Sequence, residues 1–270
     1  MENIHEVLAF YENGAETGRL ERGLGIIEAA RTKAILARYL KPGMAVYDVG
    51  GGVGYYANWL AEQGCNPTLF ELAPSAVAYA KAHQAIPYAA HTADARALPA
   101  PDASCDALLL MGPLYHLLER ESRLQALQEA NRVLRPDGLL VAAGISKFSS
   151  ATWALSTYRV ANDFLDDETY MEMLRGELTT GRHHRPEKYP NFIAQAYFHT
   201  PEALAAELAE AGFSPARLLA VEGCIWYTPN LNEKWSDPAA RARLEELLSL
   251  TESEPSLLGL SPHFLAISTK

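Results

Sequence analysis

Cysteine is scarce in this sequence. The 270 residues include three cysteines, Cys65, Cys105 and Cys224, which lie far apart and form no Cys-x-x-Cys pair. An odd and scattered set indicates neither a disulfide framework nor a zinc site. The acidic residues also form no cluster with the helical or turn spacing of metal ligands, so we expect no metal ion.

Long hydrophobic runs and an excess of positive charge are absent as well. No apolar run approaches the ~20 residues that span a bilayer, and no basic segment followed by an apolar one forms a secretory signal. We therefore expect a cytoplasmic protein. Its 23 Lys and Arg residues stand against 33 Asp and Glu, which gives a net charge of -10. Because nucleic acids and anionic membranes are bound by basic surfaces, we expect neither as a partner. The oligomeric state is left open.

Glycine, by contrast, is concentrated in one place. Residues 46–54 read Val-Tyr-Asp-Val-Gly-Gly-Gly-Val-Gly and precede an amphipathic helix. A strand, a glycine turn and a helix let a ligand lie against bare backbone at the carboxyl end of the strand. The dinucleotide pattern Gly-x-Gly-x-x-Gly does not fit, because its last glycine would fall on Tyr55 or Ala57. The pattern that fits is acid-x-Gly-x-Gly-x-Gly, at Asp48, Gly50, Gly52 and Gly54.

This pattern resembles the first motif of the class I S-adenosylmethionine (SAM) dependent methyltransferases of the small-molecule type. The resemblance covers residues 44–145 well and 200–268 loosely. It implies SAM as the cofactor, with the glycine loop around its methionine part. Asp48 can accept a hydrogen bond or pair with an ammonium group there.

Acids after the next two strands extend the resemblance. Glu71 can accept hydrogen bonds from both ribose hydroxyls, although an exposed acid at a strand end is the alternative. The resemblance places Asp94 and Ala95 at the adenine, whereas a helix N-cap or loop aspartate is the competing interpretation of Asp94. The expected cofactor-binding residues are Tyr11, Asp48, Gly50, Gly51, Gly52, Gly54, Glu71, Leu72, Asp94, Ala95, Met111 and Leu114.

The segment 111–117, Met-Gly-Pro-Leu-Tyr-His-Leu, follows the fourth expected strand. Its Gly-Pro-Leu-Tyr-His-Leu string looks like a bacterial subgroup of small-molecule methyltransferases. His116 is a candidate general base, because the unperturbed pKa of histidine lies near neutrality. A structural hydrogen bond is the more common role of a single histidine. Tyr115 is an equal candidate as a wall of the pocket, and we name both residues as catalytic candidates.

Strands and helices alternate along most of the chain, which is typical of a doubly wound parallel sheet. We predict an α/β protein with a seven-strand, mostly parallel sheet, the Rossmann-like methyltransferase fold, and an inserted helical cap. After the first strand at residue 46, strands are expected at 68–71, 86–91, 104–111, 139–145, 217–221 and 263–268.

Four regions are expected along the chain. They are an N-terminal helical segment covering the cofactor site (1–40), the SAM-binding core (41–146), a cap insertion (147–199), and the rest of the core (200–270) with a second insertion at 223–260. Structureless loops of such length are improbable in a compact domain, so we expect both insertions to form a helical lid. Their many aromatic residues either line a pocket or, as we favour, build the lid's own core. For the basic run at 181–185 we favour a solvated polar loop over recognition of an acidic substrate group.

These features together predict an enzyme that moves a methyl group from SAM to an O, N, S or C atom of a small-molecule acceptor. The activated methyl group belongs to the cofactor, so the protein mainly supplies proximity and alignment. Two alternatives come from other classes. One is a SAM-binding protein without turnover, acting as a regulator or partner subunit, and the other is an NAD(P)-dependent oxidoreductase. Methylation of protein or RNA ranks lower.

Overall fold

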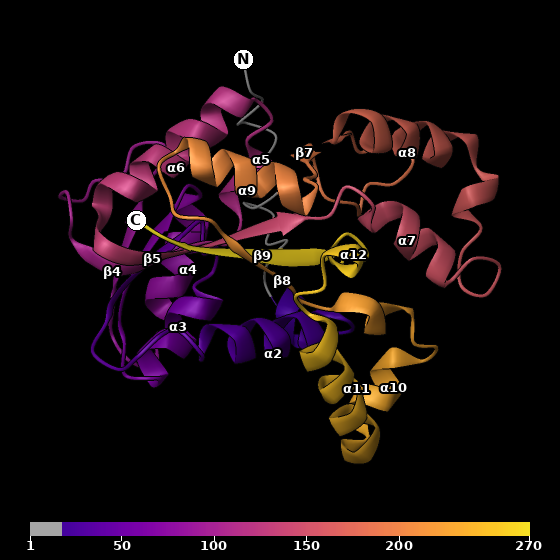
Figure 1. Ribbon diagram of the computed structural model, residues 1–270, viewed down its shortest axis with the longest axis horizontal. Helices are drawn as coiled ribbons and strands as arrows, with labels where there is room; N and C mark the ends of the chain where they lie inside the picture. The colour runs from indigo at the N-terminus through magenta and orange to yellow at the C-terminus, as the bar shows by residue number, and fades with distance from the viewer. Residues whose placement is uncertain (1–17) are drawn as a thin grey trace.

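A seven-stranded sheet forms the centre of the protein. The computed structural model describes residues 18–270, and the sheet lies between two layers of helices (Figure 1). The strands are β1 (Ala45–Val49), β2 (Asn66–Glu71), β3 (Ala89–Thr92), β4 (Cys105–Leu110), β5 (Leu134–Ile145), β8 (Arg217–Ala220) and β9 (His263–Thr269). Their order across the sheet is β3-β2-β1-β4-β5-β9-β8.

The strand order reverses between β1 and β4. Strand β1 pairs in parallel with β2 on one side and with β4 on the other, whereas β9 runs antiparallel to both β5 and β8. In open α/β sheets, ligands bind in the crevice beyond the carboxyl ends of the strands at such a reversal. The predicted α/β fold with a seven-strand, mostly parallel sheet is confirmed.

Two strands begin at residues other than those predicted. Strand β3 starts at Ala89 instead of residue 86, because Pro87 has no N–H to donate to a ladder. Strand β5 starts at Leu134, directly after a helix, and its pairing with β4 shifts in register between Cys105 and Ala107. Residues 135–138 are therefore an irregular part of β5, whereas the strand was expected to start at residue 139.

Helices cover both faces of the sheet. Helices α2 (Gly25–Leu36), α3 (Tyr55–Glu62) and α4 (Pro74–Ala82) lie on one face, and α5 (Pro113–His116), α6 (Arg120–Val133) and α9 (Pro201–Glu210) on the other. The side chains of β4 alternate between these layers. Leu108 and Leu110 pack with α6 and α9, while Ala107 and Leu109 pack with residues of α2 and α3. Burial on both faces accounts for the unbroken apolar run of this strand.

Two insertions extend from one end of the sheet, on the right in Figure 1. The first follows β5 and contains α7 (Ser149–Ser156), η2 (Phe164–Asp166), α8 (Glu168–Thr180) and the two-stranded ribbon of β6 (Arg182–His183) and β7 (Ala196–Tyr197). The second follows β8 and contains η3 (Gly223–Tyr227), α10 (Leu231–Ser236), α11 (Pro238–Thr251) and α12 (Pro255–Leu258). Helices thus occupy both long segments between the strands of the sheet.

The helices are short. Helices α6 and α11 have 14 residues each, and across residues 18–270 no helix has the length and hydrophobicity that crossing a membrane requires.

Candidate functional site

The glycine loop lies where the strand order reverses. Gly50, Gly52 and Gly54 have φ angles of 70°, 56° and 81°, in the left-handed region that favours glycine. The Gly50 N–H donates to the carbonyl of Phe70 over 2.7 Å. A Cβ on residue 50 would come within 2.5 Å of the Pro113 ring. Glycine at position 50 therefore lets the loop after β1 approach the start of α5, beyond the carboxyl end of β4.

Glu71 ties the end of β2 to this loop. Its Oε2 accepts a hydrogen bond from the Gly52 N–H over 3.0 Å, and its Oε1 accepts one from the Ala73 N–H over 2.9 Å. The side chain is 7% exposed. The buried carboxylate thus joins the end of β2 to the loop after β1.

Asp48 is buried under the same loop. Its side chain is fully inaccessible, and neither carboxylate oxygen has a hydrogen-bond partner of ordinary geometry. Burial and the nearby Glu71 carboxylate raise the pKa of Asp48 to about 7, against a smaller opposing effect of the Ala57 amide. An unsatisfied buried carboxylate is costly, and a cationic group beside it would offset part of that cost.

A cavity of ≈320 Å³ opens beside the glycine loop. Of the residues predicted from the sequence, Gly50, Gly51, Gly52 and Met111 line it. Sequence reasoning missed other lining residues, chiefly Arg19, Tyr55, Asn58, Tyr79 and His83. Tyr55 and Asn58 follow the loop by one and four residues, and the rings of Tyr79 and His83 stack 3.9 Å apart on one face of α4. For Tyr55 and Asn58, the position directly after the motif was the available signal.

The other predicted cofactor residues do not line this cavity. The Leu114 side chain is fully buried in the core below α5. Gly54 caps α3, and a Cβ there would overlap the Tyr88 hydroxyl, so its role in the structure is close packing. Asp48, Glu71, Leu72 and the Asp94–Ala95 pair lie outside the lining. Tyr11 lies outside the described residues.

The Asp94 carboxylate is engaged within its own turn. Arg96 donates to both of its oxygens, through Nε over 3.0 Å and Nη2 over 2.7 Å. Burial raises the pKa of Asp94, but the hydrogen bonds from Arg96 outweigh it and leave the pKa lowered. An adenine amino group at this place would have to share the carboxylate with a guanidinium.

Tyr115 and His116 have different surroundings. Tyr115 lines the first cavity, and its hydroxyl donates to the Met111 carbonyl over 3.0 Å. Within residues 18–270, His116 lines neither this cavity nor the one under the insertions that is described below. Burial lowers the pKa of His116 to about 4, against a hydrogen bond with the Gln195 backbone. Its ring lies edge-on to that of Tyr115, with centroids 4.8 Å apart. His116 is thus placed to position Tyr115.

A second cavity, of ≈740 Å³, lies between the core and the insertions. Trp153 and Phe198 of the first insertion, Trp226 of the second, and Ile145 at the end of β5 contribute apolar lining. Arg19 and Tyr115 line both cavities. The two spaces therefore adjoin each other.

The aromatic residues of the first insertion divide between two roles. Tyr170 is fully buried, and a cluster of rings packs around it, made up of Trp153, Phe164, Tyr189 and Phe192. The expected lid core therefore exists, while Trp153 also faces the second cavity.

The basic run at 181–185 is not a solvated loop. His183 is 2% exposed and its Nδ1 lies 2.6 Å from the buried Glu177 carboxylate, because α8 folds back on the β6–β7 ribbon. Arg182 pairs with Glu119 of the core. The expectation of a free polar loop is wrong for these two residues.

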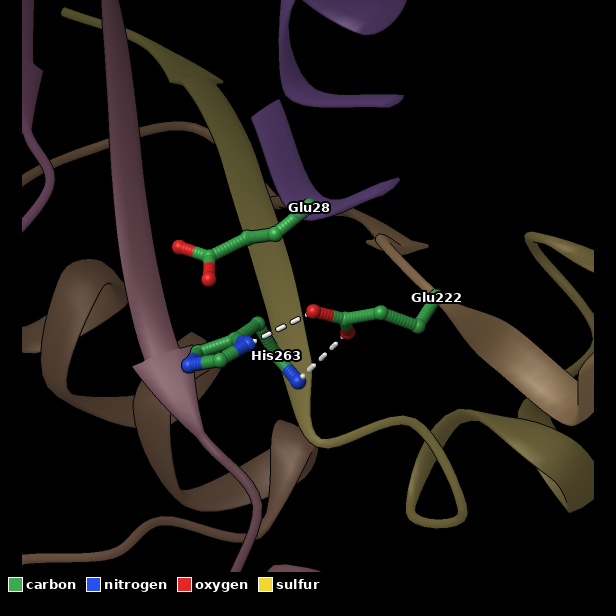
Figure 2. Close-up of side chains that lie close together, drawn as sticks. All are labelled: Glu28, Glu222 and His263. Carbon is green, nitrogen blue, oxygen red and sulfur yellow. Dashed lines mark hydrogen bonds and ion pairs between the residues drawn. The ribbon is translucent and has the colours of Figure 1, made fainter. Parts of the chain in front are cut away.

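A charged cluster lies at one edge of the second cavity. Figure 2 shows Glu222 bound to the ring and the backbone of His263, with Glu28 reaching toward them from α2. His263 Nδ1 lies 2.7 Å from Glu222 Oε1, and the His263 N–H donates to Oε2 over 3.0 Å. Arg19 holds Glu28 through two hydrogen bonds of 2.7 and 3.0 Å.

One ligand atom from each of Glu28, Glu222 and His263 lies within 4.8 Å of the others. A metal ion would need a neutral imidazole. Burial lowers the pKa of His263, but Glu222 and Glu28 outweigh it and raise the pKa to about 9. Each carboxylate thus already has a cationic neighbour. A metal ion would have to displace a proton from His263 and the guanidinium of Arg19.

Comparisons with known proteins agree with this fold. A family model described as "Methyltransferase domain" matches residues 47–142. A SAM-dependent methyltransferase of Mesorhizobium loti has a similar structure, with a TM-score of 0.59 at 18% identity, over 90% of this chain and all of that one. A methyltransferase solved in complex with the Haloferax volcanii Trm112 methyltransferase activator gives a TM-score of 0.57 at 17% identity, over 96% of each chain.

One curated relative matches part of the chain. The mouse (Mus musculus) tRNA (carboxymethyluridine(34)-5-O)-methyltransferase ALKBH8 is 33% identical over 103 residues. This match covers 37% of the chain, and the chain spans only 14% of the length of that relative.

These two comparisons correct the predicted partners. The acidic composition led us to exclude nucleic acids, yet the curated relative is named for action on tRNA, and the Trm112 complex joins a similar fold to a protein activator. Net charge is a sum over the whole chain and does not reveal a local basic patch, so it cannot exclude a nucleic-acid partner. The exclusion of nucleic-acid partners is therefore wrong.

The glycine motif predicted the family, and three observations now agree with it. They are the strand order, the position of the loop at its reversal, and the match of the family model to residues 47–142. The predicted fold is confirmed, and the match of residues 47–142 supports the predicted methyltransferase class. Residues 47–142 match the methyltransferase-domain family, and the chain as a whole has the fold of the class I SAM-dependent methyltransferases.

Proposed function

We propose that the protein transfers the methyl group of SAM to an acceptor atom of a small molecule held in the second cavity. The observation that carries the proposal is the meeting of two cavities at Arg19 and Tyr115. One lies against the glycine loop and the other lies under the insertions. A cofactor in the first and an acceptor in the second would meet beside Tyr115, which lines both cavities.

The residues around the glycine loop fit the cofactor. The loop presents bare backbone, and two acceptors beside it, the Asp48 carboxylate and Asn58 Oδ1, have no donor. The methionine part of SAM carries an ammonium group, which is a donor and a cation. Glu71 would receive the ribose hydroxyls while it holds Gly52. Asp94 and Ala95 would meet the adenine only if the amino group shares Asp94 with Arg96.

The chemistry that SAM supplies is an activated methyl group on a sulfonium, so the protein's own contribution is placement. Tyr115 would form one side of the place where the two spaces meet, fixed by its hydrogen bond to the Met111 carbonyl. Trp153, Phe198 and Trp226 would exclude water from the acceptor. His116 lies outside both cavities, so no general base is assigned to it.

The size of the second cavity supports a small acceptor. A volume of ≈740 Å³ lies in the range of ordinary small-molecule sites, roughly 300–1,000 Å³. Its lining combines large apolar side chains with a few charged ones, which is typical of such sites.

Cofactor binding gives the first test. S-adenosylhomocysteine should bind to the protein in a calorimetric titration, and NADH should not. Glu71→Gln should weaken that binding by more than about tenfold, because charge-assisted hydrogen bonds to the ribose are lost. Glu62→Gln, an exposed acid at the end of α3, is the matched control and should bind normally. Equal affinity of the Glu71 variant and the native protein would remove the ribose assignment.

Methylation of tRNA is a second candidate, favoured by the name of the curated relative. Incubation with methyl-labelled SAM, with either a metabolite extract or bulk tRNA, separates the two. Label in a small molecule supports the proposal. Label in tRNA replaces it, and label in neither, with S-adenosylhomocysteine bound, favours a binding protein without turnover.

A further inference from the structure

The second cavity carries positive charge that its own acids do not balance. Three basic side chains line it, Arg19, Arg22 and His263. Two of them are matched by carboxylates, since Arg19 pairs with Glu28 and His263 with Glu222. Arg22 is left over. Among residues 18–270, the charge of the cavity edge is therefore about one unit positive.

Arg22 is available for a ligand. It follows η1 (Arg19–Glu21), its side chain is exposed, and within residues 18–270 that side chain makes no hydrogen bond or ion pair. Arg19 differs, because its guanidinium holds both oxygens of Glu28. A guanidinium without a partner presents a planar pair of N–H donors that matches a carboxylate or phosphate.

His263 offers a second donor. Its Nδ1 and its backbone N–H are both committed to Glu222, and Ser261 donates a further hydrogen bond to that carboxylate. The other ring nitrogen, Nε2, has no partner among the described residues, and the side chain is 28% exposed where it lines the cavity. Figure 2 shows the ring held by Glu222 at its Nδ1 side, which leaves Nε2 directed away from that carboxylate.

The imidazole is positively charged at neutral pH. Burial opposes the charge, but Glu222 and then Glu28 outweigh burial and raise the pKa of His263 to about 9. Nε2 is consequently an N–H donor on a cation near neutrality. The groups that face this ring are Glu222, Glu28 and Arg19, from three different elements, and Arg22 lines the same cavity.

The remaining walls are apolar. Trp153, Phe198 and Trp226 contribute aromatic rings, and Ile145 adds an aliphatic one. Aromatic walls favour a planar apolar body, while the basic edge favours one negative charge at its end.

We propose that the second cavity binds a planar, apolar small molecule that carries a single carboxylate, held by the Arg22 guanidinium and the His263 Nε2–H. This inference rests on the proposed function only in calling that molecule the methyl acceptor. A carboxylate is favoured over a phosphate monoester, because one unmatched guanidinium balances one negative charge and a phosphate carries nearly two at neutral pH.

Binding of three probes tests the inference directly. The native protein, alone and saturated with S-adenosylhomocysteine, is titrated at pH 7 with 2-naphthoate, with the neutral 2-naphthamide and with 2-naphthyl phosphate. We expect 2-naphthoate to bind at least about tenfold more tightly than the amide and more tightly than the phosphate. Equal affinity for naphthoate and naphthamide overturns the anion site, and tighter binding of the phosphate overturns the choice of carboxylate.

Variants locate the site. Arg22→Gln and His263→Gln should each weaken naphthoate binding by about tenfold and leave naphthamide and S-adenosylhomocysteine binding unchanged. Arg243→Gln, on the exposed side of α11, and His184→Gln, exposed after β6, are the matched controls. His263→Gln leaves Glu222 buried without its cation and can lower stability, so Arg22→Gln decides the question if the His263 variant does not fold. Normal naphthoate affinity in Arg22→Gln overturns the proposal.

The pH dependence adds a readout that a structural role would not change. Naphthoate affinity should fall as pH rises through about 9, as His263 loses its proton, and this fall should vanish in His263→Gln. The two arginines keep their charge in this range.

Competition between naphthoate and a short oligonucleotide would reassign the basic edge to a nucleic-acid phosphate. If S-adenosylhomocysteine fails to bind while naphthoate binds as expected, the proposed function fails and the anion site stands.

Discussion

The carboxylate of Asp48 lies directly beneath Gly51, so close that a Cβ on residue 51 would overlap its Oδ2 atom. The side chain is fully buried without a hydrogen-bond partner, and burial, with the Glu71 charge, raises its pKa to about 7. An acid whose pKa is higher in the folded protein than in the unfolded chain lowers the free energy of unfolding at every pH above its unfolded pKa, because the unfolded chain ionises more readily there. That cost starts near the unfolded pKa of 3.8 and grows as pH rises to about 7.

Asp48→Asn should therefore stabilise the protein, and more so at higher pH. The amide has no titration, so its advantage over the carboxylate should grow by about 2–3 kcal/mol between pH 5 and pH 8, from a pKa shift of this size. Chemical denaturation at both pH values measures the effect. A stability difference that stays constant with pH, or that favours the native protein more at pH 8, would contradict the raised pKa.

The same variant separates stability from cofactor binding. If the Asp48 carboxylate pairs with the ammonium of the methionine part, Asp48→Asn should bind S-adenosylhomocysteine more weakly while it melts at a higher temperature. A gain in both properties would leave Asp48 without a role at the cofactor.

His116 was a candidate base, and its position predicts a different outcome. It is outside both cavities and its pKa is lowered to about 4, chiefly by burial. Once an acceptor is known, His116→Asn should keep the form of the pH profile of kcat between pH 6 and pH 9 and should bind S-adenosylhomocysteine normally. Its turnover should fall less than that of Tyr115→Ala, which removes the wall shared by both cavities. If His116→Asn loses turnover while the Tyr115 ring keeps its native position, the hypothesis that His116 is a general base is supported again.

The local part of the site could be predicted from the sequence. Asp48 and the glycines at 50–54 lie within one strand and one turn, so their spacing alone indicates where the backbone must be bare. Glu71 was found the same way, because it ends the next strand of an alternating pattern. The unbroken apolar run of β4 predicted burial on both faces, which the structure shows.

The second cavity could not be predicted, because its residues meet only through the fold. Arg19 and His263 are 244 positions apart in the sequence. The sequence around each residue does not indicate that Arg19 pairs with Glu28, that His263 pairs with Glu222, or that the two pairs lie together. The insertions were expected to form a lid, but which of their rings face inward depends on packing around Tyr170. Sequence spacing also placed His183 in a solvated loop, whereas the fold of α8 buries it against Glu177.

A buried carboxylate of the second insertion binds two arginines of the core. Glu252, at the end of α11, accepts from Arg31 Nη2 over 2.8 Å and from Arg38 Nη2 over 2.9 Å, and its side chain is 7% exposed. Burial raises the pKa of Glu252, but Arg38 and Arg31 outweigh burial and leave it lowered. Stability from this contact is therefore present above the unfolded pKa of 4.5 and is lost as pH falls below it.

Glu252→Gln should loosen this insertion and the cavity wall that it carries. Removal of one member of a buried ion pair costs about 3–5 kcal/mol, because the partner charge is left uncompensated. Arg31 is the buried partner here, at 5% exposed. Hydrogen exchange should rise through α10 and α11 and around Trp226, which lines the second cavity, while the amides of β1 and β4 stay protected. Glu246→Gln, whose carboxylate pairs with Arg243 in solvent on the same helix, is the matched control.

Because the loss follows from an ionised carboxylate, the difference in the free energy of unfolding between Glu252→Gln and the native protein should shrink as pH falls from 6 to 4. A difference that persists unchanged at pH 4 would mean that packing and not charge holds the insertion to α2.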